Sequence, residues 1–124
     1  MPEFEIAALA DPTAANLKQA ARLVPNAKTY SDHRKMLAEE NDLDAVIVVT
    51  PSFLHAEVTV AGLNRRLHVL CEKPMATRLE DANRMINAAK TSGKLRYIGF
   101  QKRFVPANAR MHELAAAGKS AASR

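Results

Sequence analysis

The chain has 124 residues, of which 48% are hydrophobic and 25% charged, with one cysteine. This length and composition predict one ordinary globular domain. No run approaches the roughly 18 apolar residues of a membrane span, and the short acidic N-terminus lacks the pattern of a secretory signal. The single cysteine excludes an intrachain disulfide framework, so we expect a cytoplasmic protein.

The net charge of +5 is concentrated toward the C-terminal end. Residues 90–124 hold eight Lys or Arg and one acidic residue, whereas residues 1–89 hold ten and twelve. A basic end can bind nucleic acid or phosphate. Because these basic residues are spread over a strand, a loop and a helix with few aromatics, we expect a solvated or anion-facing surface. We expect neither a nucleic acid nor a membrane partner.

Strands and helices are predicted in alternation from the first residues onward. The apolar run at residues 5–10 predicts a strand. Asp11 and Pro12 then have the pattern of an N-cap and a first helical residue, and Pro25 ends that helix. Residues 27–30 predict a short edge strand.

Three more strands are predicted at residues 45–49, 67–71 and 95–100. The first of these is β-branched and uninterrupted, which is typical of a strand covered on both faces. The helices between and after the strands are predicted to begin at Ser31, near Leu54, at Thr77 as a capping box, and before Ala107. Because parallel strands need crossover connections, this alternation predicts an α/β fold with a parallel sheet covered by helices.

The most specific motif is Glu72-Lys73-Pro74, where an apolar strand ends abruptly. Ligands of open α/β sheets bind at the carboxyl ends of the strands. Lys73 at that edge is a candidate to exchange a proton with a substrate hydroxyl while hydride moves to a nicotinamide ring. The alternative is a surface turn with a solvated ion pair.

Two further segments end predicted strands in the same way. Asp11 would accept hydrogen bonds from the ribose of a dinucleotide, and it would serve equally as a helix cap. The turn at Thr50 and Pro51 would lie against a flat ligand. Its alternative is an ordinary strand-to-helix turn in which His55 faces solvent.

The last predicted strand is followed by Gln101 and Arg103. These side chains would bond a carboxamide or a phosphate. The alternative for them is an exposed basic loop.

Two kinds of site lack support in the sequence. No G-x-G-x-x-G motif occurs, so the usual pyrophosphate turn at a helix N-terminus is absent. The histidines share no ligand spacing, so we expect no metal site.

Taken in order, four segments resemble the N-terminal NAD(P)-binding Rossmann domain of the glucose-fructose oxidoreductase, inositol dehydrogenase and MocA family. They are A-L-A-D-P, D-A-V-I-V-V-T-P-S-F-L-H, H-V-L-C-E-K-P-M-A-T and G-F-Q-K-R-F-V-P-A. The resemblance covers about residues 4 to 118. It implies NAD- or NADP-dependent oxidation or reduction of a sugar, an inositol or a related polyol.

The resemblance also implies roles for particular residues. Lys73 would lie at the reaction centre, and the acid at position 11 implies NAD rather than NADP. The residues implied to contact the cofactor are Asp11, Thr50, Pro51, His55, Glu72, Gln101 and Arg103.

The chain departs from the family pattern at both ends. The family's first strand and glycine-rich turn, expected before Phe4, are missing, as is the substrate domain expected after Gly118. We therefore expect a partial dinucleotide-binding domain at residues 1–118 and a disordered tail at 119–124. The function expected is that of an oxidoreductase fragment with weak NAD binding and little or no activity alone. The alternative is a non-catalytic module that oligomerises or binds a nucleotide or anion.

The resemblance thus implies an incomplete doubly wound parallel sheet, Rossmann-like, with helices on both faces. The missing strand would occupy the centre of the sheet, in the order 3-2-1-4-5-6. Without it, the strands at residues 5–10 and 45–49 either pair directly or leave open edges. Because open edges recruit other chains, we expect a homodimer or a higher oligomer.

Overall fold

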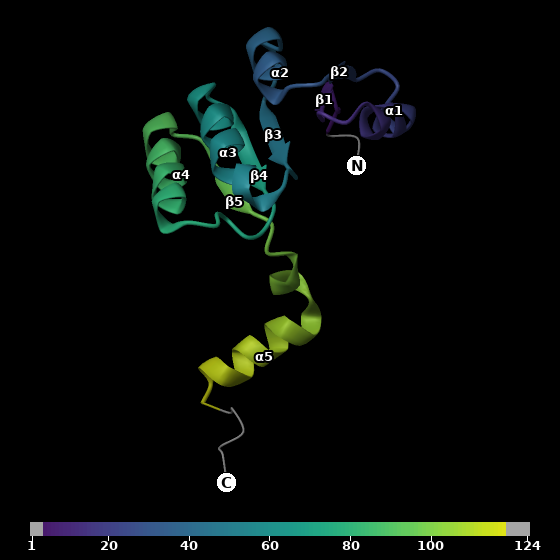
Figure 1. The fold of residues 1–124 in the computed structure, drawn as a ribbon. Coiled ribbons are helices and arrows are strands. Elements are labelled where there is room, and N and C mark those ends of the chain that lie inside the picture. The colour runs from purple at the N-terminus through teal and green to yellow at the C-terminus, as the bar shows by residue number, and fades with distance from the viewer. Residues whose placement is uncertain (1–3, 119–124) are drawn as a thin grey trace.

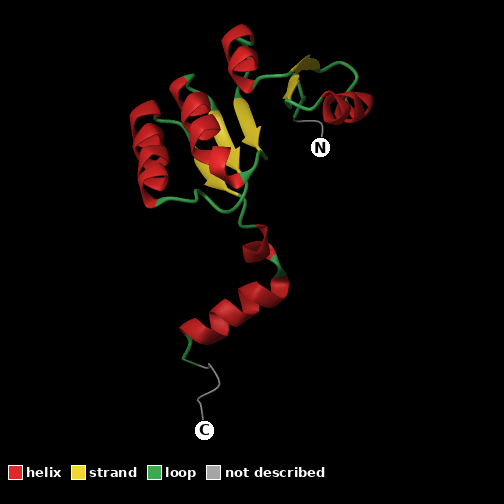
Figure 2. Cartoon of the chain, in the orientation of Figure 1, coloured by secondary structure: helices red, strands yellow, loops and turns green. Residues whose placement is uncertain are grey.

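The computed structural model describes residues 4–118, so the tail predicted at 119–124 lies outside the described residues. Strands and helices alternate along the chain, as Figures 1 and 2 show. The strands are β1 (Ala8–Ala10), β2 (Lys28–Tyr30), β3 (Ala45–Val48), β4 (His68–Cys71) and β5 (Arg96–Ile98). The helices are α1 (Ala14–Leu23), α2 (His33–Glu39), α3 (His55–Asn64), α4 (Leu79–Ser92) and α5 (Pro106–Ala116), with 3₁₀ turns at Ser52–Leu54 and Gln101–Phe104.

All strand pairs are parallel, which confirms the α/β class and the parallel sheet. The described strands form two separate sheets, β1-β2 and β3-β4-β5. Helix α2 contacts β1 and β2 on one side and α3 on the other, so it connects the two sheets (Figure 1). The strands β1 and β3 do not pair, so each keeps an open edge in the described part of the chain.

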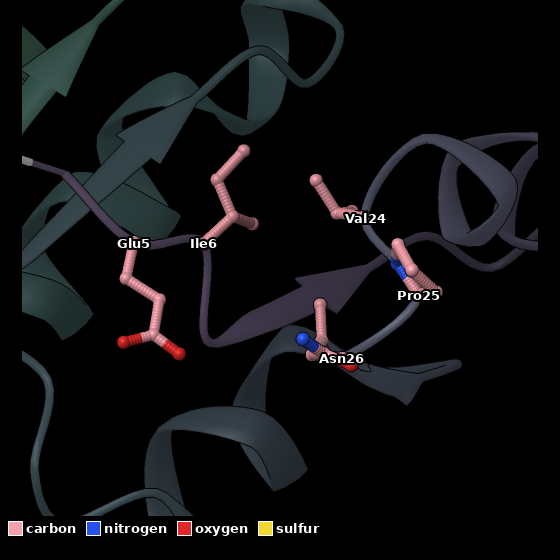
Figure 3. A pocket seen from close by; sticks show the side chains of 6 residues that line it. Glu5, Ile6, Val24, Pro25 and Asn26 are labelled. Carbon is pink, nitrogen blue, oxygen red and sulfur yellow. The ribbon is translucent and has the colours of Figure 1, made fainter. Parts of the chain in front are cut away.

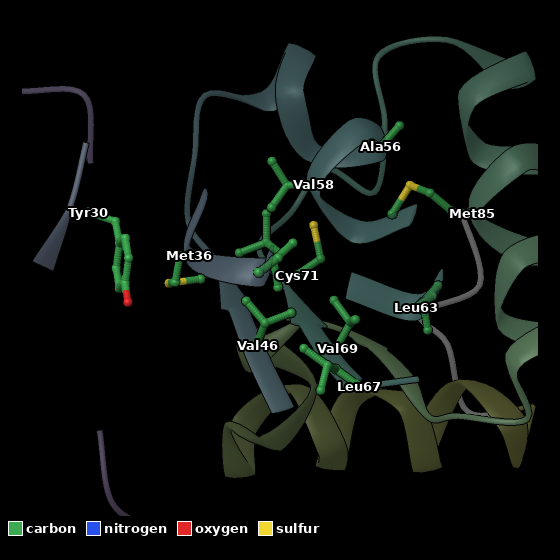
Figure 4. Close-up of a cluster of buried hydrophobic side chains, with 12 residues drawn as sticks. Tyr30, Met36, Val46, Ala56, Val58, Leu63, Leu67, Val69, Cys71 and Met85 are labelled. Atoms are coloured by element: carbon green, nitrogen blue, oxygen red, sulfur yellow. The ribbon is translucent and has the colours of Figure 1, made fainter. Parts of the chain in front are cut away.

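The main core lies between the β3-β4-β5 sheet and the helices α3 and α4. Figure 4 shows the side chains of this core gathered from both strands and helices. Val69 and Cys71 of β4 are 2% and 0% exposed, and Leu63 of α3 and Met85 of α4 are fully buried.

The opposite face of this sheet is open, so the prediction that residues 45–49 are covered on both faces is wrong. Ile47 is 65% exposed and Val49 is 71% exposed. Ile47 pairs in register with Leu70, and Leu70 pairs with Tyr97, so these apolar side chains form one row across the sheet. Successive residues of a strand point to opposite faces, and helices α3 and α4 cover only one of them.

The predicted helix N-caps at Asp11, Ser31 and Thr77 are also wrong, each by one or two residues. At the second helix, Asp32 Oδ1 accepts a hydrogen bond from the Arg34 amide at 2.8 Å, which Ser31 is one residue too early to do. Arg78 makes no side-chain cap bond, so no capping box forms there. The observed N-caps are Thr13, Asp32 and Arg78.

Helix α5 projects away from the sheet (Figure 1). Its main contacts are with the 3₁₀ turn at Gln101–Phe104, and Met111 of this helix is 61% exposed. Within residues 4–118, no helix is both long and apolar enough to cross a membrane.

The burial of Leu63 in α3 predicts how a substitution in the core changes stability. Leu63→Ala removes a fully buried side chain from the core. We expect it to lower the free energy of unfolding by about 2–5 kcal/mol, because it leaves a cavity between the helix and the sheet. Leu23→Ala is the matched control, since Leu23 is 83% exposed. We expect it to change stability by about 0.5 kcal/mol or less. Equal effects in urea denaturation would contradict this packing.

Candidate functional site

The segments that follow β3, β4 and β5 lie together because the three strands are parallel and in register. The Glu72 amide donates to the Val48 carbonyl at 2.9 Å, and the Gly99 amide donates to the Cys71 carbonyl at 2.8 Å. These bonds continue the ladder one residue beyond β4 and β5. The predicted site residues after these strands therefore share one edge of the sheet.

The carboxylate of Glu72 joins two of these segments. Its Oε1 accepts a hydrogen bond from Gln101 Nε2 at 2.7 Å, and its Oε2 accepts one from the Lys73 amide at 3.1 Å. A side-chain Cβ at Gly99 would lie 3.1 Å from Glu72 Oε1, so a glycine leaves room for this carboxylate. This role of Gly99 was not predicted, although a glycine inside the strand expected at residues 95–100 signals the close approach of another group.

The side chain of Lys73 is exposed at this edge. Within residues 4–118 its ammonium makes no ion pair, so the alternative of a solvated ion pair has no support there. The peptide bond between Lys73 and Pro74 is cis. The exposed lysine directly follows Glu72, whose carboxylate accepts the hydrogen bond from the Lys73 amide.

His55 lies beneath this edge and is only 1% exposed, so the alternative in which it faces solvent is wrong. It is the first residue of α3. Its Nδ1 lies 2.7 Å from the carbonyl oxygen of Pro74, and its Nε2 lies 2.9 Å from the carbonyl oxygen of Thr50. The imidazole therefore connects the segment after β3 with the segment after β4.

The turn at Thr50 and Pro51 carries a buried hydroxyl. Thr50 Oγ1 has no hydrogen-bond partner among the described residues. A buried hydroxyl without a partner is costly unless another group bonds it. The turn is thus suited to a polar ligand, as a bound dinucleotide would be.

Asp11 follows β1, at the carboxyl end of the smaller sheet. Its Oδ1 accepts a hydrogen bond from the Thr13 amide at 2.7 Å, and its Oδ2 accepts one from Asn16 Nδ2 at 3.1 Å. The Thr13 amide, followed by the Asn16 amide, holds the pKa of this carboxyl below its usual value. An ionised carboxylate with free lone pairs fits the hydroxyl groups of a ribose.

Arg103 lies in an exposed basic segment. Its guanidinium is 5.9 Å from the centre of the Phe100 ring, within the range of a cation–π contact. A hollow of about 460 Å³ is lined by Lys102, Arg103, Asn108 and His112. The predicted basic surface is therefore concave here.

A smaller hollow of about 150 Å³ lies at the other end of β1 (Figure 3). Its lining comes from the segments that lead into β1 and β2: Glu5, Ile6, Val24, Pro25, Asn26 and Ala27. This is the amino edge of the sheet, opposite Asp11. It is therefore separate from the candidate site.

Neither a metal-binding cluster nor a reactive thiol is found among the residues that the structure describes. Residues 4–118 contain no group of three His, Cys, Asp or Glu side chains that would hold a metal ion. Cys71 is fully buried, and this burial raises the pKa of its thiol. A thiol of this kind is a core residue rather than a nucleophile.

Comparison with known proteins agrees with this geometry. Residues 1–100 match the model of the Gfo/Idh/MocA oxidoreductase family, described as an oxidoreductase family with an NAD-binding Rossmann fold. The chain belongs to this family. It is 34% identical over 101 residues to an inositol 2-dehydrogenase of Arthrobacter sp. (strain FB24), a match that covers 81% of this chain and 30% of that protein. The chain thus spans about 30% of the length of the curated relative.

Solved structures of dehydrogenases are similar to most of the chain. The WlbA dehydrogenase of Chromobacterium violaceum, in complex with NADH and UDP-GlcNAcA, is 32% identical with a TM-score of 0.85 and covers 91% of this chain and 32% of its own. A levoglucosan dehydrogenase, in complex with NADH and levoglucosan, is 28% identical with a TM-score of 0.79 and covers 92% of this chain and 30% of its own. These matches confirm the Rossmann-like class of the fold.

The lowered pKa of Asp11 predicts how its contribution to stability depends on pH. Its pKa in the folded chain lies below the usual 3.8, so the folded state binds fewer protons than the unfolded state as the pH falls toward that value. Its contribution to stability is therefore present above the unfolded pKa and is lost as the pH falls through the folded pKa. We expect NMR titration to find the lowered pKa, and Asn16→Ala to raise it. An unchanged value in Asn16→Ala would contradict the bond from Asn16.

Proposed function

We propose that this chain forms part of the cofactor-binding half of an NAD-dependent oxidoreductase that acts on an inositol, a sugar or a related polyol. The observation that carries the proposal is the shared edge of Thr50, Glu72, Lys73 and Gln101, in a chain of this oxidoreductase family. The relatives named as inositol 2-dehydrogenase support the substrate class.

In this proposal Lys73 is the catalytic residue. Bound NAD would supply an acceptor for the hydride that leaves the carbinol carbon. Lys73 Nζ would take the proton of the substrate hydroxyl, so that the carbon–oxygen bond becomes a carbonyl. The carboxylate of Glu72, held by Gln101 and the Lys73 amide, would keep the lysine segment at the edge of the sheet.

The remaining proposed contacts hold the cofactor. Asp11 would accept hydrogen bonds from the adenosine ribose, and its charge would repel the 2′-phosphate of NADP. Thr50 and Pro51 would lie along the dinucleotide, with the free hydroxyl of Thr50 as a bonding group. Arg103 would lie near the nicotinamide and the substrate.

We also propose that the 124-residue chain has little activity by itself. Lys73 and Pro74 are exposed to solvent. Water at the reacting atoms weakens the electrostatic interactions on which proton and hydride transfer depend. NAD-dependent oxidation of inositol by the pure chain, above that of a Lys73→Met variant, would contradict this part of the proposal.

The test of cofactor binding is a titration of the chain with NADH and with NADPH. We expect saturable NADH binding and weaker NADPH binding. In Asp11→Asn the charge is removed with little change in shape, so we expect the affinity for NADPH relative to NADH to rise about tenfold, equivalent to about 1.4 kcal/mol.

Asp42→Asn is the matched control, because Asp42 is an exposed acid. We expect it to leave the preference between the two cofactors unchanged. If neither cofactor binds at millimolar concentration, the oxidoreductase proposal for this chain fails, and the non-catalytic module becomes the better interpretation.

We further propose that the chain forms a homodimer or a higher homo-oligomer through its sheet edges. The open edges of β1 and β3 and the exposed row Ile47, Leu70 and Tyr97 support this, because such surfaces favour association. We expect light scattering at micromolar concentration to give a mass of at least twice 13.6 kDa. A stable species of 13.6 kDa would contradict it.

A further inference from the structure

The imidazole of His55 is deeply buried beside the candidate site. It is 1% exposed, at the first turn of α3. A buried polar ring is costly unless its nitrogens are bonded. Here both nitrogens have a partner within 3 Å: Nδ1 lies 2.7 Å from the Pro74 oxygen, and Nε2 lies 2.9 Å from the Thr50 oxygen.

The two partners lie in segments that are distant along the chain. Thr50 follows β3, and Pro74 is the residue directly after Lys73. Both partners are backbone carbonyl oxygens, which only accept hydrogen bonds, so an N–H of the ring must be the donor. The shorter of the two distances is the one to Pro74.

The packing of α3 does not require a histidine at this point. The helix is held against the sheet by Leu63 and by the close approach of Gly62 to Val46, near the other end of the helix. An apolar ring would fill the space of the imidazole but would bond neither carbonyl. A hydrogen bond from the ring to a carbonyl therefore constrains the segment that carries that carbonyl.

We propose that His55 is a positioning residue that holds Lys73 at the edge of the sheet, through a hydrogen bond donated by Nδ1 to the Pro74 carbonyl. Nε2 faces the Thr50 carbonyl. The inference rests on the proposed function, because it gives Lys73 its importance. It assigns His55 a role beneath the site, in place of the direct cofactor contact implied by the family resemblance.

The test uses two substitutions, and each of them keeps a nitrogen atom at about the place of one of the two ring nitrogens. The amide nitrogen of asparagine occupies about the place of Nδ1, and that of glutamine about the place of Nε2. In His55→Asn the bond to Pro74 is therefore kept, and in His55→Gln it is lost. The readout is the backbone amide of Lys73, which donates to Glu72 Oε2 at 3.1 Å.

We expect the NMR signal and the hydrogen exchange rate of the Lys73 amide in His55→Asn to stay close to the original chain. In His55→Gln we expect the signal to move and exchange to accelerate about fivefold, the equivalent of one neutral hydrogen bond. Equal changes in both variants would overturn the inference, because a purely structural histidine would affect Lys73 in the same way in each.

A measurement on the unaltered chain keeps the inference testable if either variant fails to fold. Long-range ¹H–¹⁵N spectra report which imidazole nitrogen carries a proton. We expect a proton on Nδ1 of His55, and a bare Nδ1 would overturn the inference. None of these readouts needs a cofactor, so a failure to bind NADH would count against the proposed function alone.

Discussion

The close contact of helix α3 with strands β3 and β4 is the constraint on which the rest of this structure depends. A Cβ at Gly62 would lie 2.8 Å from Val46 Cγ1, so only glycine lets the helix approach this closely without a shift. Leu63 is fully buried beside it. Near one end the helix is held by this packing, and at the other the ring nitrogens of His55 lie within 3 Å of the carbonyl oxygens of Thr50 and Pro74.

This constraint links stability to the candidate chemistry. The parallel ladder brings the ends of β3, β4 and β5 to one edge, and Glu72 joins two of the segments that leave it. The exposed Lys73 therefore lies on backbone that this ladder and the carboxylate of Glu72 hold in place. Ligands of open α/β sheets bind at this kind of edge.

The division of the strands into two sheets leaves the Asp11 part of the candidate site without support from the main core. The β1-β2 pair carries Asp11, and it contacts the larger unit through α2 rather than through strand pairing. One face of β3-β4-β5 is left with the apolar row Ile47, Leu70 and Tyr97. The two parts of the candidate cofactor site thus depend on different elements for their support, and only the part at Lys73 belongs to the main core.

The sequence by itself determined the alternation of strands and helices, their parallel pairing and the edge where Glu72, Lys73 and Gln101 meet, because periodicity and strand-ending motifs are local. The helix caps at Asp32 and Arg78, the open face at Ile47 and the burial of His55 were decided only by the tertiary structure. A cap depends on the path of the chain into the helix, and coverage of a strand depends on which helices are present. The ring nitrogens of His55 contact residues 5 and 19 positions away, so no local pattern predicts these contacts.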